Sequence, residues 1–293
     1  MNPILRAIYF AAIIVLGYIL RKIGVFKKED FKVLSNIVLK LTLPATVIVN
    51  FAGKSIEPSL LLLMVMGLGF GIIYMIVGHL TNKSFGLLNL SGYNIGNFAL
   101  PFIQNIFGPA GVIATSVFDV GNACVCLGGS YGIAASLKGN SKFSYKKLLK
   151  AMVTSVPLVC YVVMIVLSLV KISLPSELTS FVQIIANANV FLGMLMLGIG
   201  IDITAERSQI KKIAKILSLR YGLAVGFALG TYFLLPFSEE VRKVLLFLVF
   251  SPVASAAPAY TEQLGEDTGL ASAINSISIF CSVVIFVAFL LIL

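Results

Sequence analysis

The sequence predicts an all-α membrane protein in which ten transmembrane helices form two inverted repeats of five helices each. Of its 293 residues, 59% are hydrophobic and only 12% are charged, against roughly 25% charged in a soluble domain. The mean hydropathy is +1.02, and apolar runs long enough to cross a bilayer recur along the whole chain. Such runs form helices in lipid because a helix satisfies its own backbone polar groups where water is absent.

Breaks between the apolar runs define the ten expected helices. The first five lie near residues 3–20, 33–51, 58–79, 86–106 and 110–136, and the second five near 149–170, 175–200, 213–235, 240–260 and 268–292. The fourth and ninth runs differ from the others because polar residues and prolines interrupt them. The longest polar connection covers residues 137–150, which leaves no room for a soluble domain. We therefore expect two halves, residues 1–147 and 148–293.

Lysine and arginine in short connections favour the cytoplasmic side of a membrane. They gather in the first, fifth and seventh connections: Arg21, Lys22, Lys27, Lys28 and Lys32, then Lys138, Lys142, Lys146, Lys147 and Lys150, then Arg207, Lys211, Lys212 and Lys215. The protein would then cross the cell (inner or plasma) membrane ten times, and both of its termini would lie on the outer side. The net charge of +10 thus sets orientation in the lipid bilayer, and no nucleic-acid surface is expected because the charges flank helix ends.

The residue inventory disfavours an enzyme and an ATP-driven pump. An enzyme would need a nucleophile with a base, or a metal cluster. His79 is the only histidine, and the four cysteines lie within predicted helices without metal-ligand spacing, so we expect buried free thiols and no firm metal site. The phosphate-binding G-x-x-x-x-G-K-[ST] motif is absent, so any transport would be secondary. A channel would instead show a continuous polar stripe or rings of charge.

An internal repeat relates the two interrupted helices. In "NFALPFIQNIFG" (97–108) and "ASAAPAYTEQLG" (254–265), Pro101 aligns with Pro258 and Gly108 with Gly265. Because each half holds an odd number of helices, the second half enters the membrane in the opposite orientation. In transporters with inverted repeats, broken helices at matching positions meet near the bilayer midplane and bind the substrate there.

Polar residues beside these prolines are the predicted substrate site. Pro101 has no backbone N–H and would clash with the carbonyl of Asn97, so the helix is expected to open there. Opened half-helices offer unpaired N–H groups and partial positive charge to an anion. The predicted substrate-binding residues are Asn94, Asn97, Pro101, Ser251, Ser255 and Pro258. A simple kink at each proline, with the polar side chains mediating helix packing, is the alternative.

Asp119 is the only acidic residue well inside a predicted helix, and Asn122 lies three residues later on the same face. A carboxylate inside a bilayer costs roughly 2.5 to 3.5 kcal/mol on insertion scales, which marks it as a functional candidate. The two side chains could bind Na⁺, or Asp119 could carry a proton, and we expect no other cofactor. A structural hydrogen bond or an ion pair between Asp119 and Lys40 is the alternative.

With these features the chain resembles the auxin efflux carrier family, the plant PIN proteins and their shorter bacterial relatives. The resemblance rests on "LTLPATVIVNFAG" (41–53), "NIGNFALPFIQNIFG" (94–108) and "SPVASAAPAYTEQLGEDTGLASAINS" (251–276), with Asn94, Pro101 and Gly108 at the family's spacing. It implies a ten-helix, two-repeat fold in which helices 4 and 9 cross at the substrate site. It also implies interleaved scaffold and transport subdomains, elevator-type alternating access and often a homodimer.

The bacterial members that the chain resembles look like carriers of small organic anions, above all carboxylates. The expected function is therefore secondary transport of such an anion. Two carriers of related fold remain as alternatives, a Na⁺-coupled symporter similar to the bile-acid symporters and a Na⁺/H⁺ antiporter. The antiporter is less favoured because such exchange usually requires a pair of buried acidic residues, and the sequence offers only Asp119.

Overall fold

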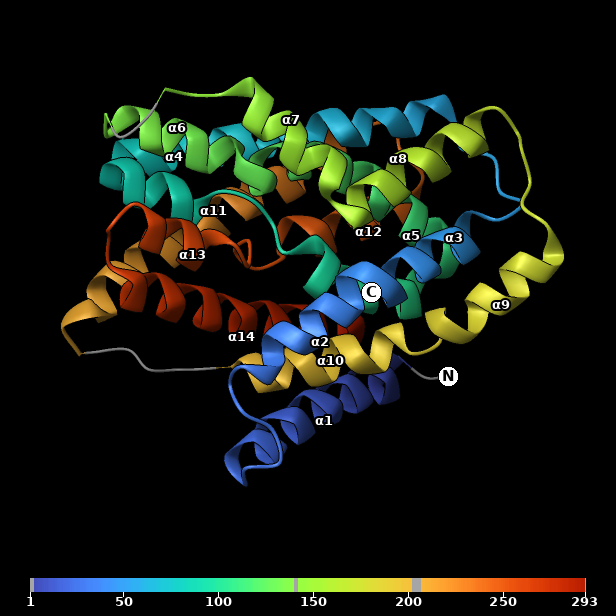
Figure 1. The fold of residues 1–293 in the computed structure, drawn as a ribbon, viewed down its shortest axis with the longest axis horizontal. Coiled ribbons are helices and arrows are strands. Elements are labelled where there is room, and N and C mark those ends of the chain that lie inside the picture. Colours follow the sequence, from blue (N-terminus) through green and yellow to red (C-terminus); the bar gives the residue numbers. More distant parts are fainter. Residues whose placement is uncertain (1–2, 140–141, 202–206, 293) are drawn as a thin grey trace.

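The protein is described by a computed structural model that covers residues 3–139, 142–201 and 207–292. The described chain consists of helices and connecting loops and holds no β-strand, in agreement with the all-α class (Figure 1). The first half contains α1 (Pro3–Lys22), α2 (Asp30–Ile37), η1 (Val38–Thr42), α3 (Leu43–Phe51), η2 (Pro58–Leu61), α4 (Leu62–Leu90), η3 (Ile95–Ala99), α5 (Leu100–Cys124), η4 (Val125–Gly129) and α6 (Ser130–Leu137). The second contains α7 (Tyr145–Thr154), α8 (Val156–Leu169), α9 (Ser176–Ala186), α10 (Asn189–Gly200), η5 (Arg207–Gln209), α11 (Ile210–Leu234), α12 (Glu239–Val249), α13 (Ala257–Gln263) and α14 (Thr268–Ile292).

Six helical segments of the described chain are long and apolar enough to cross a membrane, or seven if α7 and α8 count as one bent span. The chain is therefore a polytopic helical membrane protein, but this criterion does not yield the ten predicted helices. The predicted ninth helix is one reason, because it consists of α12 with 11 residues and α13 with seven, and a span needs about 20. The predicted fourth and fifth helices are another, because they share one helical segment, 95–137, interrupted at Gly108 with φ of 56°.

The predicted third and fourth helices are joined by a turn inside α4. Asn82 and Lys83 leave the helical conformation, and Lys83 takes a φ of 43°. After this turn, residues 84–90 form a short helical segment that lies close to the end of the preceding one, since a Cβ atom on Gly86 would overlap the carbonyl oxygen of Gly78. The predicted fourth helix therefore begins as a short half-helix that ends at Leu90, and it resumes at Ile95 after a break.

The predicted helix 149–170 is wrong as a single straight span. The chain bends by 76° between α7 and α8, where Ser155 adopts an extended conformation. Pro157 lies in the first turn of α8, a position that proline favours because the N–H it lacks has no partner there. The predicted boundary between the two halves, at residue 147, falls inside α7.

The helices pack as two bundles: the first consists of α1, α2, η1, α3, α8, α9 and α10, and the second of α4, η3, α5, η4, α6, α11, α12, α13 and α14. In the first bundle, α1 packs on α10, and α3 packs on α8 and α9; in the second, α4 packs on α5 and α6, and α13 on α14. Figure 1 shows α1 beside α10 at one edge of the molecule and α4 with α6 at the opposite edge. Glycines bring backbones together within each bundle, Gly17 against Gly198 in the first and Gly67 against Phe118 in the second, as is common between membrane helices.

Five phenylalanines form one cluster, in which Phe10 comes from the first bundle and the other four rings come from the second. The ring of Phe10 on α1 lies edge-on to Phe102 on α5, with ring centroids 5.1 Å apart. Phe286 on α14 contacts Phe98, Phe102 and Phe247 at centroid distances of 4.8 to 5.2 Å. Edge-to-face pairs of this kind stabilise beyond the area they bury. The bundles therefore share one apolar core.

The glycine contact between α4 and α5 predicts an asymmetric response to alanine. A Cβ on Gly121 would overlap the backbone of Met64, whereas a Cβ on Gly69 of the same α4 would meet no atom within 4 Å. Gly121→Ala is expected to lower stability by about 1 to 3 kcal/mol through overpacking. Gly69→Ala is the control and should leave the melting temperature in detergent unchanged or slightly higher, because alanine favours helix. Equal melting temperatures for both variants would contradict this packing.

Candidate functional site

The two interrupted helices meet at their breaks. The first break, 91–94, lies between the short segment of α4 and η3, and the second, 250–256, lies between α12 and α13. Tyr93 and Val253 form an isolated antiparallel β-bridge, and the N–H of Asn94 donates to the carbonyl oxygen of Pro252 at 3.0 Å. Two segments 160 residues apart in sequence thus satisfy each other's backbone groups in the middle of the protein.

Pro101 does not open its helix where the sequence analysis expected. It lies in the first turn of α5, and the preceding five residues, 95–99, form a wider π-helical turn. This turn accommodates the missing N–H and the bulk of the proline ring, so the true break lies seven to ten residues earlier. Pro258 likewise starts α13, whereas Pro252 lies within the second break itself.

Arg220 of α11 joins both breaks. Its side chain is fully buried, and its guanidinium donates to the carbonyl oxygens of Leu90 and Gly92 in or beside the first break, at 2.6 and 3.0 Å. It also donates to the carbonyl oxygens of Ser251 and Pro252 in the second, at 2.8 and 2.9 Å. Carbonyl groups that the opened helices leave free are therefore satisfied by one cation.

Asparagines from the helices that follow hold each break in place. Asn122 of α5 accepts from the N–H of Tyr93 at 2.9 Å and donates to the carbonyl oxygen of Tyr93 at 3.0 Å, so its carboxamide mimics a backbone partner. Asn275 of α14 donates to the carbonyl oxygens of Val253 and Ala254 at 3.2 and 3.3 Å. Asn122 therefore positions the first break, and Asn275 the second.

A cavity of about 260 Å³ opens beside the breaks and gathers most of the predicted site. Its wall includes Asn94, Asn97, Asp119, Asn122 and Ser255 from the prediction. The opposite wall comes from the first bundle through Leu39 of η1 and from the start of α8. The cavity therefore lies between the two bundles.

Three predicted residues do not line this cavity. The ring of Pro101 packs against Gly193 of α10. Ser251 is buried, and its hydroxyl donates to the carbonyl oxygen of Phe247 at 3.0 Å. Pro258 lies half-buried in the first turn of α13. These three shape the breaks without facing the cavity.

Among the described residues that line the cavity, Asp119 has the only acidic or basic side chain. Its Oδ1 accepts a hydrogen bond from Nδ2 of Asn122 at 2.8 Å. The buried hydroxyl of Tyr161 comes close to this carboxylate but satisfies hydrogen-bond geometry with no described residue. No ion pair to Asp119 occurs in the described part of the chain, and Lys40, the alternative partner, is exposed. The carboxyl group is therefore available to a ligand or to a cation.

Two hydrogen-bonded links connect the bundles beside the cavity. Nδ2 of Asn97 donates to the hydroxyl of Ser35 on α2 at 3.2 Å. Asn189 of α10 is fully buried; it accepts from the hydroxyl of Thr42 at 2.8 Å and donates to Oε1 of Gln104 on α5 at 3.0 Å. A relative movement of the bundles would have to exchange these bonds.

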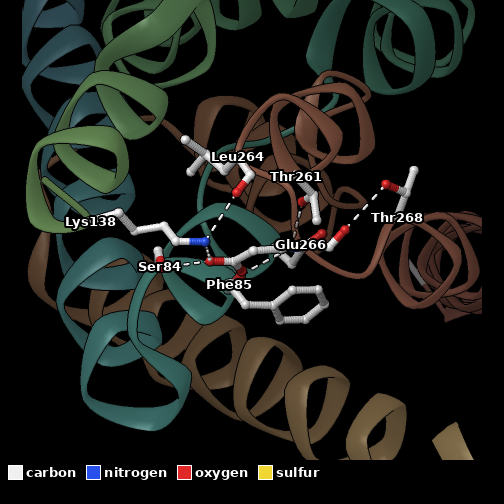
Figure 2. A network of polar contacts seen from close by, with 8 residues as sticks. Ser84, Phe85, Lys138, Thr261, Leu264, Glu266 and Thr268 are labelled. Carbon is white, nitrogen blue, oxygen red and sulfur yellow. Dashed lines mark hydrogen bonds and ion pairs between the residues drawn. The ribbon is translucent and has the colours of Figure 1, made fainter. Parts of the chain in front are cut away.

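A second polar network ties the far ends of the two short half-helices (Figure 2). Glu266, just after α13, accepts from the hydroxyl of Ser84 at 2.7 Å and pairs with Nζ of Lys138 at 2.9 Å. Lys138 also donates to the carbonyl oxygen of Leu264 at 3.0 Å. Deeper in the same contact, Nδ2 of Asn89 donates to the hydroxyl of Thr261 at 3.0 Å. The half-helices are thereby fixed to each other along their length.

Sequence reasoning missed Arg220, Tyr161, Ser35 and Asn275. Arg220 had a usable signal, because it lies well inside the predicted helix 213–235 and the cost of a charge in the bilayer applies to it as it does to Asp119. The other three are ordinary polar residues in apolar helices, and only their spatial partners distinguish them.

No family model matches the chain. Among proteins of curated name, it is similar to an uncharacterized transporter of Methanocaldococcus jannaschii, with 26% identity over 210 residues. The aligned part is 65% of this chain and 66% of that protein, so it spans slightly less than two thirds of the relative's length. The apolar helices make the chain a membrane protein, and the protein it resembles carries the name of a transporter.

The network in Figure 2 predicts a measurable coupling between its two charges. Lys138→Gln and Glu266→Gln, alone and combined, should give a coupling of about 0.5 to 1 kcal/mol in thermal unfolding, because the pair is partly buried and shares hydrogen bonds. The control is Lys243 with Glu239, an i,i+4 pair on α12 at 2.8 Å in which Glu239 is 72% exposed. That pair should show no measurable coupling. Equal results for the two pairs would contradict a role in fixing the half-helices.

Proposed function

We propose that the protein is a secondary transporter of a small organic anion, such as a carboxylate, and that the cavity beside the two breaks is its substrate site. The observation that carries this proposal is the convergence of both backbone breaks on one cavity between two bundles, with Asn94, Asn97 and Asp119 on its wall. Matching broken helices that meet inside a bundle are the usual substrate site of transporters with repeats. The similarity to an uncharacterized transporter supports the class of protein.

An anion is the favoured substrate because of the groups around the cavity. Ile95 and Gly96 lie at the start of the helical segment that follows the first break, where N–H groups lack intrahelical acceptors. Ala254 to Ala256 precede α13 in the same way. Helix N-termini carry partial positive charge, and the carboxamides of Asn94 and Asn97 add donors. These groups suit a carboxylate.

Asp119 couples anion binding to a cation in this proposal. An ionised carboxylate and a substrate carboxylate in one cavity would repel each other, and this repulsion is strong where water is scarce. A proton or Na⁺ on Asp119 removes it, so anion and cation would bind together. A symporter that uses Na⁺ in this way, as in the bile-acid symporters named above, is the second candidate, and Asp119 on the cavity wall is the observation in its favour.

The size of the cavity limits the substrate. Its volume of about 260 Å³ lies just below the roughly 300 to 1,000 Å³ of pockets that hold drug-sized ligands. Short-chain carboxylates fit this space, whereas a large amphipathic anion does not fit without rearrangement. This favours a carrier of small metabolites over a carrier of steroid-sized molecules.

Transport would follow from movement of the second bundle against the first. The cavity wall comes from both bundles, and the hydrogen-bonded links through Ser35 and Asn189 are neutral. We further propose that the broken helices count as two of ten crossings in two inverted repeats, with both termini outside. Asn122 and Asn275 each hydrogen-bond to the backbone of one break from the predicted helix that follows it, and this correspondence supports the symmetry. Assembly into a homodimer belongs to the same proposal.

The proposed site predicts ligand-dependent stability. A panel of small carboxylates should raise the melting temperature of the purified protein, in proportion to RT ln(1 + [L]/Kd). The shift should depend on pH or on Na⁺ in wild type and lose that dependence in Asp119→Asn. If the shift depends on pH and Na⁺ in the same way in wild type and in Asp119→Asn, Asp119 has no role in coupling. If no carboxylate raises the melting temperature, the anion proposal is contradicted.

Asn97 is predicted to contribute directly to affinity. Asn97→Ala should weaken carboxylate binding roughly 10-fold, the usual cost of losing a buried hydrogen bond, and should reduce uptake into proteoliposomes. Asn187→Ala is the matched control, because Asn187 is exposed and lies outside the cavity wall. Equal affinities in the two variants would place the substrate elsewhere.

A further inference from the structure

Arg220 is a fully buried positive charge beside both breaks, and it has no carboxylate counter-charge in the described chain. Nη1 donates to one carbonyl oxygen, and Nη2, which has two hydrogens, faces three. A guanidinium keeps its proton at any physiological pH, so the positive charge is permanent.

The surroundings of Arg220 are built around this cation. The rings of Tyr74 and Tyr93 lie 5.0 and 5.1 Å from its central carbon, within the range of cation–π attraction. The hydroxyl of Tyr74 donates to the backbone carbonyl oxygen of Arg220 itself at 2.9 Å and so fixes the helix that carries it. Partial negative charges from two rings and four carbonyl groups replace the missing carboxylate.

Carbonyl oxygens of unwound helices have a second use in transporters. Together with half-helix C-terminal ends, they coordinate Na⁺ or other coupling ions. In this protein the carbonyl oxygens of Leu90, Gly92, Ser251 and Pro252 point at one spot, at the C-terminal ends of the segment 84–90 and of α12. The guanidinium of Arg220 occupies the position between these oxygens.

We propose that Arg220 is an internal cation that occupies the carbonyl cluster of the two breaks and holds them together, so that this cluster binds no inorganic cation. Any coupling ion is then confined to the cavity side, at Asp119. The part of the proposal that confines a coupling ion to Asp119 rests on the proposed function. The part that places Arg220 in the carbonyl cluster does not. The two can be tested apart, because the occupancy changes stability without any substrate.

The test is chemical rescue of a variant that lacks the cation. Melting temperatures of wild type, Arg220→Gln, Arg220→Lys and Lys215→Gln are compared in choline chloride, in choline chloride with millimolar guanidinium, and in NaCl. Lys215 is exposed on the same α11 and serves as the control. Arg220→Gln should melt roughly 10 °C lower than wild type, since it leaves buried carbonyl groups unpaired. Guanidinium or Na⁺ should restore a large part of that loss, because either cation can enter the emptied cluster.

Arg220→Lys should lose less, since one ammonium supplies charge but fewer directed donors. Wild type and Lys215→Gln should not respond to guanidinium at this concentration. The proposal is overturned if Arg220→Gln melts like wild type, or if neither cation restores its stability.

A further measurement leaves Arg220 in place and serves if Arg220→Gln does not fold. In Asp119→Asn the cavity ligand for a cation is gone, so stability should be the same in NaCl and in choline chloride. A remaining response to Na⁺ would reveal an open cation site and overturn the proposal. None of these readouts uses a carboxylate, so a failure of the anion proposal would not be mistaken for a failure of this one.

Discussion

Opening a helix inside an apolar bundle leaves carbonyl and N–H groups without partners, and each unpaired buried group costs on the order of 1 to 3 kcal/mol. The protein opens two helices at the same place. The first break and the second satisfy part of this need by pairing Tyr93 with Val253. Arg220 satisfies the carbonyl groups that remain. The rest of the second bundle is arranged so that this set of bonds can form.

The carboxamides of Asn122 and Asn275 complete the same arrangement from two other helices. Both present hydrogen-bonding groups to backbone that has left its helix. On the far side, Asn89, Ser84 and Glu266 hold the half-helices against each other. The breaks are therefore a rigid junction, with polar groups directed along defined lines. The cavity beside the junction gains its shape from this rigidity.

Charge is distributed on opposite sides of the junction. Arg220 lies among backbone carbonyls away from the cavity wall, and Asp119 lies on the wall itself. An anion in the cavity would meet helix N-termini and carboxamides directly. Both bundles contribute residues to the cavity wall. Near its centre, the interface between them includes the contact of Phe10 with Phe102, which is apolar. Such an interface is compatible with sliding, whereas a network of buried charges across it would not be.

Composition and patterning by themselves determined the all-α membrane class, the positions of most apolar helices and the two interruptions, because lipid requires long apolar helices and proline disrupts them. They also pointed to Asn94, Asn97, Asp119 and Ser255, which line one cavity. A criterion of helix length and composition does not yield the ten predicted helices, partly because helices are broken or bent at Lys83, Gly108 and Ser155. Only the tertiary structure decided that Asn122 holds backbone, that Pro101 stands aside from the cavity and that Arg220 joins the breaks. Those roles depend on partners more than 25 residues away, and local sequence carries no record of them.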